Sequence, residues 1–181
     1  GGNAVATHDL EGALFGTALG QDIITRENVH NGHYNHLDTI NTINKAGSIK
    51  QGISKYNIDN GLIYSCVKHN IPFILAGSIR DDGPLNGVIN NTAMVQDAMR
   101  EHTKKATTVV CLATQLHTIA TGNLTPSYVV INGNVRPVFI YAVDVSEFVL
   151  NKLRDRGTLE VTTIVSNIQD FLFKVVHKLS K

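Results

Sequence analysis

The stretch PVFIYAVD, residues 137–144, is a continuous apolar run that ends at Asp144. A short run that is apolar on both faces and rich in Val and Ile is typical of a central strand in a parallel sheet, because a surface strand alternates polar and apolar residues. Three more runs have this character: IPFILAG (71–77), TTVVCLA (107–113) and YVVIN (128–132). We therefore expect these runs to form the central strands of one sheet.

Segments with helical spacing of apolar residues lie around and between these strands. They are 7–20, 36–47, 58–70, 92–106, 115–124 and 146–157, and an apolar stripe from Ile164 to Leu179 predicts a last helix. Residues 21–36 are polar and are expected to form a loop. The alternation of strands and helices predicts an α/β layered fold with a mainly parallel sheet.

The composition limits the kind of protein and its partners. The 181 residues suit one domain, with 16 basic and 15 acidic residues and a formal charge of +1. Without a basic stripe, neither nucleic acid nor a membrane surface is an expected partner. No apolar run approaches the roughly 20 residues of a membrane span. Cys66 and Cys111 lie in apolar patterns, which predicts reduced core cysteines and a cytoplasmic location.

The start of the chain bears on its organisation. It has no initiator Met and enters a helix-like segment almost at once. We expect one α/β domain over residues 1–181, belonging to a longer polypeptide with a further amino-terminal portion.

Ligands of open parallel sheets bind beyond the carboxyl ends of the strands, so the residues after each predicted strand are site candidates. They are Arg80, Asp81, Asp82 and Gly83; Ala113, Thr114, Gln115 and His117; Asn132, Gly133 and Asn134; and Asp144. Asp144 suits the ribose hydroxyls of a dinucleotide, or equally the first turn of a helix. Loop ends are polar in any protein, and the glycine fingerprint GxGxxG is absent. These residues indicate a ligand crevice, with a nucleotide as one candidate.

The histidines allow acid–base chemistry more readily than metal binding. His30, His33 and His36 are spaced by three, but the segment is rich in Gly and Asn and has no adjacent carboxylate pattern, so we expect no metal. His8 and Asp9 at a helix start suit acid–base work, or form an exposed first-turn pair.

Four blocks of sequence resemble a known family. They are GNAVATHDLEGALFGTALG (2–20), GHYNHL (32–37), GLIYSCVKHNIPFILAGSIRDDGPL (61–85) and LHTIATGNLTPS (116–127). Together they resemble the conserved domain of the LOR/SDH family, found in archaeal ornithine cyclodeaminases and in the carboxyl-terminal part of arginine dihydrolase/ornithine cyclodeaminase proteins. Deoxyhypusine synthase is a more distant resemblance, but its covalent lysine has no counterpart here, so that activity is not expected.

The resemblance implies a Rossmann-like, NAD-binding fold of the deoxyhypusine-synthase type, with NAD as cofactor. The residues it implies for NAD binding, with Asn3 and Asn132 added, are Asn3, Asp82, Gly83, Leu112, Ala113, Asn132, Gly133, Asn134, Asp144 and Val145. His117 matches a substrate-contacting histidine of the distant relative.

The same resemblance implies conversion of ornithine to proline and ammonia, and we expect a homo-oligomer because such folds often associate. Arg80 is the candidate carboxylate clamp, unless it forms a surface pair with Asp81. His8 or His117 would move protons, and Asp9 or Asp81 would attract the amine. Two alternatives stay open: a non-catalytic NAD-binding module, and an amino-acid oxidoreductase of the saccharopine or lysine type.

Overall fold

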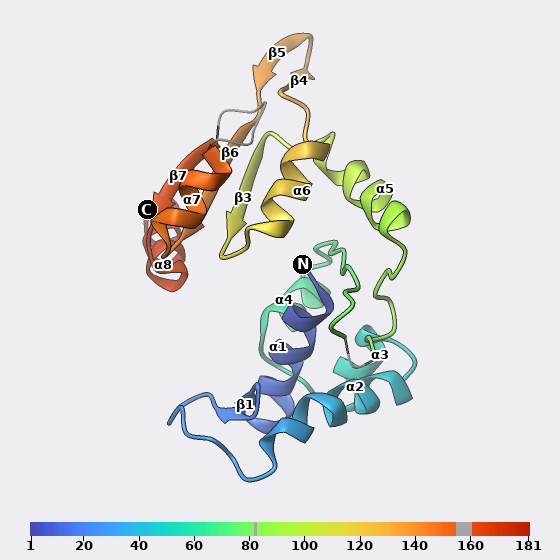
Figure 1. Ribbon diagram of the computed structural model, residues 1–181. Helices are drawn as coiled ribbons and strands as arrows, with labels where there is room; N and C mark the ends of the chain where they lie inside the picture. The colour runs from blue at the N-terminus through green and yellow to red at the C-terminus, as the bar shows by residue number, and fades with distance from the viewer. Residues whose placement is uncertain (82, 155–160) are drawn as a thin grey trace. The chain divides into compact units, whose positions relative to one another are not determined.

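The computed structural model describes residues 1–81, 83–154 and 161–181 (Figure 1). The chain folds into two compact units, Gly1–Val95 and Gln96–Lys181, which we call unit 1 and unit 2 and describe separately. Helix α5 (Thr92–Thr103) crosses the boundary in sequence. The expectation from the sequence that residues 1–181 form one domain stays a prediction.

Unit 1 is built mainly of helices. Its elements are α1 (Asn3–Phe15), β1 (Thr17–Ala18), β2 (Gln21–Asp22), the 3-10 helix η1 (Gly32–Tyr34), α2 (Asn35–Lys45), α3 (Ile49–Lys55) and α4 (Leu62–Lys68). Helix α1 packs against α2 and α4, and α2 packs against α3. Their shared core contains Leu10, Ile43 and Ile63, each 2% exposed or less. Helix α3 was not predicted, and α4 is shorter than the helix expected over 58–70.

Helix α1 begins and ends earlier than the predicted helix over 7–20. It starts at Asn3, directly after Gly2, and stops at Phe15 because Gly16 adopts a left-handed φ of 68°. The N–H of Gly16 donates to the carbonyl of Gly12 and closes the last turn. Beyond it, Gly20 lies so close to Gly32 that a Cβ on Gly20 would come 2.8 Å from the Gly32 carbonyl carbon. The loop after α1 is therefore packed against the start of η1 through the close contact of the Gly20 and Gly32 backbones.

The strand predicted over residues 71–77 is wrong. The segment forms only isolated parallel bridges, in which Ala76 pairs with Gly2 on one side and Ile89 on the other. The N–H of Asn3 donates to the Ala76 carbonyl at 3.0 Å, and the N–H of Ile89 donates to the Leu75 carbonyl at 2.9 Å. Because the chain enters α1 at Asn3, the first ladder stops after one bridge. The apolar pattern predicted burial of Leu75 correctly, but not a full strand.

Unit 2 contains a parallel three-stranded sheet. Its strands are β3 (Thr108–Leu112), β6 (Phe139–Asp144) and β7 (Val161–Val165), in the order β3-β6-β7. Each is followed by a helix: α6 (Leu116–Leu124), α7 (Glu147–Arg154) and α8 (Ile168–Leu179). Helix α7 packs on β6 and β7, and α8 on β6. The prediction of an α/β fold with parallel strands at 107–113 and 137–144 is confirmed.

Strand β7 was missed, because Ile164 and Val165 were assigned to the last helix. The helix instead begins after Asn167, whose side-chain oxygen accepts from the N–H groups of Gln169 and Asp170 at 2.9 and 3.4 Å. An Asn before an apolar stripe is a helix N-cap signal, and it divides the stripe into a strand and a helix.

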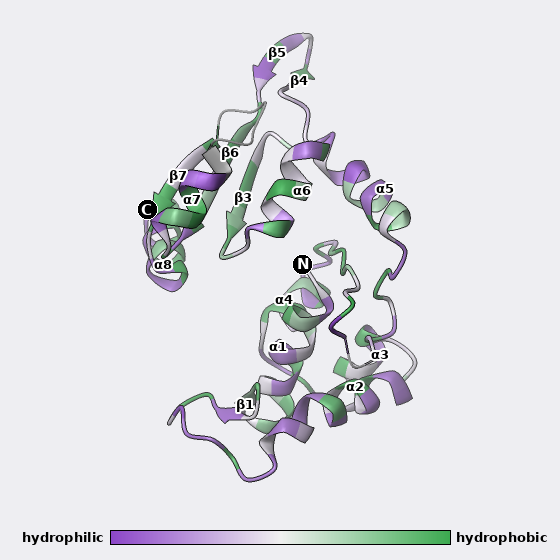
Figure 2. Cartoon of the chain, in the orientation of Figure 1, coloured by the Kyte–Doolittle hydropathy of each residue, from purple (hydrophilic) through white to green (hydrophobic). Residues whose placement is uncertain are grey.

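The third predicted central strand forms a hairpin instead. Strands β4 (Tyr128–Ile131) and β5 (Asn134–Pro137) pair antiparallel in a separate sheet. Asn132 and Gly133 at its tip both have positive φ, 51° and 80°, as a two-residue hairpin turn requires. In Figure 2, β5 is coloured mainly hydrophilic and β3 mainly hydrophobic, which fits a solvated ribbon and a sheet strand respectively.

Candidate functional site

The carboxyl edge of the β3-β6-β7 sheet brings two groups of predicted site residues together. Leu112 ends β3 and is followed by Ala113, and Asp144 ends β6 and is followed by Val145, with Leu112 in register with Val143. The N–H of Ala113 donates to the Val143 carbonyl at 2.9 Å, which ties the two strand ends to each other. Ala113 is exposed and has a left-handed φ of 50°. Its side chain is only a methyl group, so little side-chain volume covers the backbone at this turn.

His117 lies in the first turn of α6, just beyond the end of β3. Its N–H donates to Thr114 Oγ1 at 3.3 Å, which caps the helix start. The side chain is half-buried, and this burial lowers the pKa of His117 below its ordinary value. The imidazole is therefore mainly neutral at neutral pH and able to accept a proton.

Asp144 is the last residue of β6 and is half-buried. Its Oδ1 accepts from the N–H of Ser146 at 2.8 Å, a local turn that leads into α7. This contact matches the helix-start alternative named from the sequence. It leaves the ribose-binding alternative a prediction, since a carboxylate has two oxygens.

The Asn132–Asn134 turn does not share this edge. It is the tip of the β4–β5 hairpin, which directly precedes β6 and therefore lies beyond the amino-terminal end of that strand (Figure 1). All three residues are exposed. The expectation that they follow a central strand of the parallel sheet is wrong, because the Asn-Gly pair makes a hairpin turn. Their role in cofactor binding stays a prediction.

In unit 1, His8 pairs with a carboxylate that the sequence analysis did not select. His8 Nδ1 lies 2.8 Å from Glu11 Oε2, one helical turn away on α1. Glu11 is fully buried, and its Oε1 accepts from Thr17 Oγ1 at 2.7 Å. The His36 ring lies 6.2 Å from the His8 ring. The i, i+3 spacing of His8 and Glu11 was the available sequence signal.

Asp9, the neighbour of His8, caps another helix. Its Oδ1 accepts from the N–H of Leu62 and its Oδ2 from the N–H of Ile63, both at 2.8 Å. Gly61 makes this approach possible, because a Cβ there would lie 2.8 Å from Asp9 Oδ2. Both carboxylate oxygens thus hold the start of α4, which favours a structural role over attraction of a substrate amine.

The charged loop that follows residues 71–77 is internally braced. Asp81 Oδ2 accepts from the N–H of Ser78 at 2.8 Å, and the N–H of Arg80 donates to Ser78 Oγ at 3.0 Å. Arg80 is exposed, and within the described part of the chain it forms no ion pair with Asp81. Gly83 is exposed with a φ of 101°. Asp82 lies outside the described residues.

Asn3 connects this loop to α1. It is 4% exposed, and its Oδ1 accepts from the N–H of Leu85 at 3.0 Å. Thr7 Oγ1 donates to the same oxygen at 3.4 Å. The side chain therefore holds the end of the charged loop against α1, and cofactor contact by Asn3 stays a prediction.

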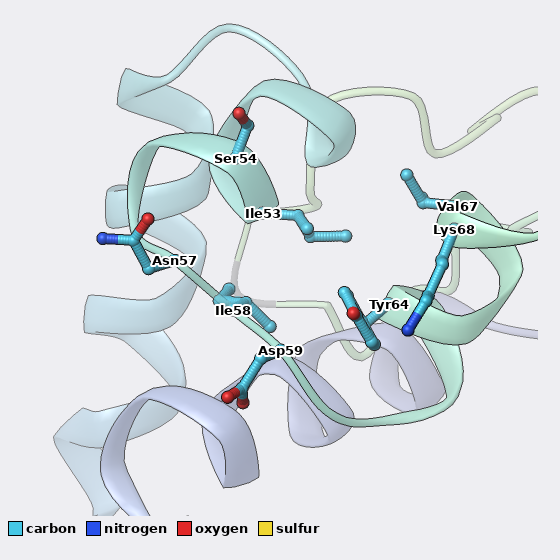
Figure 3. Close-up of a pocket in the computed structure, with 8 residues that line it drawn as sticks. All are labelled: Ile53, Ser54, Asn57, Ile58, Asp59, Tyr64, Val67 and Lys68. Atoms are coloured by element: carbon cyan, nitrogen blue, oxygen red, sulfur yellow. The ribbon is translucent and has the colours of Figure 1, made fainter.

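A pocket of about 580 Å³ lies elsewhere in unit 1 and contains none of the predicted site residues (Figure 3). Its lining includes Ile58, Asp59, Tyr64 and Lys68, which come from α4 and the segment before it. The Lys68 ammonium lies 5.2 Å from the centre of the Tyr64 ring. This cation–π contact occupies the charged end of Lys68 and covers one ring face.

Within residues 1–81, 83–154 and 161–181, no three His, Cys, Asp or Glu side chains gather closely enough to hold a metal ion. Over the same described residues, no helix is both long and apolar enough to cross a bilayer.

The parallel sheet, the helix after each strand and the polar strand ends define a Rossmann-fold domain. The sequence matches the family described as "Arginine dihydrolase ArgZ-like, C-terminal, Rossmann fold" over residues 1–175. The chain belongs to this family.

Comparisons with individual proteins agree with this assignment. The chain is 47% identical over 180 residues to the ornithine cyclodeaminase of Methanocaldococcus jannaschii, covering 99% of this chain and 40% of that protein. A conserved LOR/SDH protein from Methanococcus maripaludis S2 has a crystal structure similar to this one, with a TM-score of 0.87 and 42% identity over 99% of this chain and 51% of that chain. The resemblance to the LOR/SDH family drawn from the sequence is therefore confirmed.

A third relative was solved with ligands. AgrE, a bifunctional arginine dihydrolase/ornithine cyclodeaminase from a Nostoc species, has a crystal structure in ternary complex with ornithine and NAD+. The TM-score is 0.86 with 39% identity, over 99% of this chain and 25% of that one. The chain spans less than half the length of the archaeal enzyme and about a quarter of AgrE.

Proposed function

We propose that the protein is an NAD-dependent ornithine cyclodeaminase, a lyase that converts ornithine to proline and ammonia. The observation that supports this most strongly is the likeness to AgrE, which was solved with ornithine and NAD+ and aligns over 99% of this chain. The archaeal relatives named ornithine cyclodeaminase support the same assignment.

The carboxyl edge of the β3-β6-β7 sheet suits NAD. Ala113 adds only a methyl group at an exposed left-handed turn, so a ligand can approach the backbone there. Asp144 at the next strand end offers carboxylate oxygens for ribose hydroxyls, with Leu112 and Val145 beside them. Asn3, Asp82, Gly83 and the Asn132–Asn134 turn, named from the sequence, remain further candidates for NAD binding, each proposed independently of this edge.

When bound, NAD supplies the chemistry of accepting a hydride from the ornithine α-carbon and returning it, so no net oxidation occurs. The resulting imine is attacked by the δ-amine, the α-nitrogen leaves as ammonia, and the ring is reduced to proline. In this scheme Arg80 holds the substrate carboxylate through paired N–H donors. His117 or His8 accepts and returns protons, and Asp81 attracts the cationic amine, since both Asp9 oxygens are bonded to the start of α4.

Isotope labelling tests this reaction on the full polypeptide. With NAD+ and ornithine deuterated at the α-carbon, we expect proline that keeps deuterium at its α-carbon, because the hydride returns within one turnover. Heavy nitrogen placed at the α-amine should appear in ammonia, and heavy nitrogen at the δ-amine should remain in proline. Loss of deuterium to water, or ammonia from the δ-amine, would contradict the proposal.

The same assays separate the alternatives. A non-catalytic NAD-binding module would bind NAD in calorimetry and release no ammonia. An oxidoreductase of the saccharopine or lysine type would need an external oxo-acid and change NADH absorbance steadily, whereas cyclodeamination leaves that absorbance level.

The setting of the enzyme is also a proposal. Free Cys66 and Cys111 support a reducing compartment, the cytoplasm, and proline biosynthesis is the metabolic role that the reaction implies. We propose a homo-oligomer, which light scattering on the full polypeptide would test.

A further inference from the structure

We infer that Glu11 is a positioning residue that fixes the tautomer and orientation of His8, which makes His8 the proton-transfer group of the proposed reaction. This inference rests on the proposed function and deepens it. It assigns proton transfer to His8 instead of His117. It also gives a role to the buried acid Glu11, which cofactor and substrate binding leave unexplained.

The contact has the geometry of a directed hydrogen bond. Nδ1 of His8 and Oε2 of Glu11 are 2.8 Å apart, with the His8 side chain 26% exposed and the Glu11 side chain 0% exposed. When the Glu11 carboxylate is ionised it only accepts hydrogen bonds, so Nδ1 then carries a hydrogen, and in the neutral ring Nε2 keeps its lone pair. A neutral imidazole with its lone pair on Nε2 is the form that accepts a proton from a substrate.

The Glu11 carboxylate is itself held firmly. Thr17 Oγ1 donates to Oε1 at 2.7 Å, and Asn35 Nδ2 donates to Thr17 Oγ1 at 2.9 Å. The N–H of Leu19 lies 3.3 Å from Oε2, and that of Gly20 lies 3.4 Å from Oε1. The Thr17 hydroxyl and the N–H groups of Leu19 and Gly20 all donate to the carboxylate, so it presents an acceptor to His8. A partly exposed imidazole braced by a buried, multiply bonded acid is an arrangement that preorganises a catalytic side chain.

Asp9 and His36 are titratable groups near the His8–Glu11 pair. Asp9 uses both carboxylate oxygens to cap α4. His36, on α2, has its ring 6.2 Å from the His8 ring and tilted by 55°. Glu11 is thus the carboxylate bonded to the His8 ring.

Glu11→Gln and Thr17→Val in the full polypeptide form a matched pair. Glu11→Gln keeps the volume but leaves one accepting oxygen, whereas Thr17→Val removes a donor from the other carboxylate oxygen and leaves the His8 contact. Nitrogen chemical shifts of the His8 ring, measured without substrate, report the tautomer. We expect Glu11→Gln to move His8 from the Nδ1–H toward the Nε2–H form and to lower kcat by roughly a hundredfold, with KM changed less than about threefold. Thr17→Val should keep the wild-type tautomer and lower kcat less than Glu11→Gln does, because the contact between Glu11 and His8 stays.

Each outcome decides whether Glu11 positions His8 or serves only as a structural acid. An unchanged tautomer in folded Glu11→Gln, or equal loss of kcat in both variants, overturns the inference and leaves Glu11 a structural acid. If the wild-type polypeptide releases no ammonia from ornithine and NAD+, the proposed function fails. The tautomer measurement still supports or overturns the bond between Glu11 and His8 in that case, since it needs no turnover.

Discussion

Cys111 lies buried in β3, whereas Cys66 on α4 is half-buried. Burial raises the pKa of the Cys111 thiol, so less of it is thiolate near neutral pH, and the thiolate is the reactive form. We expect a thiol reagent at about pH 8 to modify Cys66 at least about tenfold faster than Cys111. Reaction of Cys66→Ser and Cys111→Ser variants checks this, because the fast phase should vanish only in Cys66→Ser. Similar rates for the two thiols would contradict it.

Single residues also show how far the sequence could identify the site. Ala113 and Asp144 were correctly placed at one sheet edge because they lie at the ends of real parallel strands, and such strand ends meet at one edge. Glu11 was missed because an acid near a helix start is usually assigned to the solvated first turn, and burial against Thr17 and Leu19 depends on how the chain returns after α1. The local sequence pattern does not show how the chain returns after α1.

Among the elements, α4 depends on a cap from a residue distant in sequence. Asp9→Ala removes the acceptor of two backbone N–H groups at its start, so we expect the free energy of unfolding to fall by about 1–2 kcal/mol. Urea unfolding measures this, and Asp59→Ala is the control, because Asp59 is an exposed acid just before α4 and its loss removes the same charge. Lost turnover with unchanged stability in Asp9→Ala would instead favour contact with substrate.

The loop after α1 depends on the contact of Gly20 with Gly32. Gly20→Ala places a Cβ against backbone that cannot move aside, in addition to the strain of a φ of 76°. Gly16 has a similar φ of 68° but open space around it, so Gly16→Ala isolates the strain. We expect losses of stability of about 2–4 kcal/mol for Gly20→Ala and about 1 kcal/mol for Gly16→Ala, by urea unfolding. Equal losses of stability in the two variants would show that the contact between the Gly20 and Gly32 backbones adjusts to the added Cβ.

The patterns of apolar residues explain which strands could be predicted from the sequence. Strands β3 and β6 were found because buried parallel strands form continuous apolar runs. Residues 71–77 have an equally apolar run but lack partners of sufficient length, since the chain turns into α1 at Asn3. The hairpin could have been predicted from Asn132-Gly133, a stronger local signal than the apolar character of YVVIN.

For the whole molecule, cofactor binding should appear as stability. A ligand that binds only the folded state stabilises it by about 2.7 kcal/mol at roughly 100 times its Kd. We therefore expect NAD+ to raise the Tm of the full polypeptide by several degrees, and Asp144→Ala to abolish most of that shift. Asp170→Ala is the matched control, because Asp170 is an exposed acid in the first turn of α8, after the neighbouring strand. An equal loss of the shift in both variants would indicate general charge, not a ribose contact.

The β4–β5 ribbon has a consequence for handling the protein at high concentration. In that two-stranded sheet each strand is an edge, and Val130 and Val135 are 61% and 71% exposed. Strand β5 carries Arg136 and Pro137, a charge and a missing N–H of the kind that discourage a foreign strand from adding on. Strand β4, with the sequence YVVI, has neither safeguard. Aggregation by strand addition is therefore expected to start along β4, and a lysine in place of Val130 should delay it.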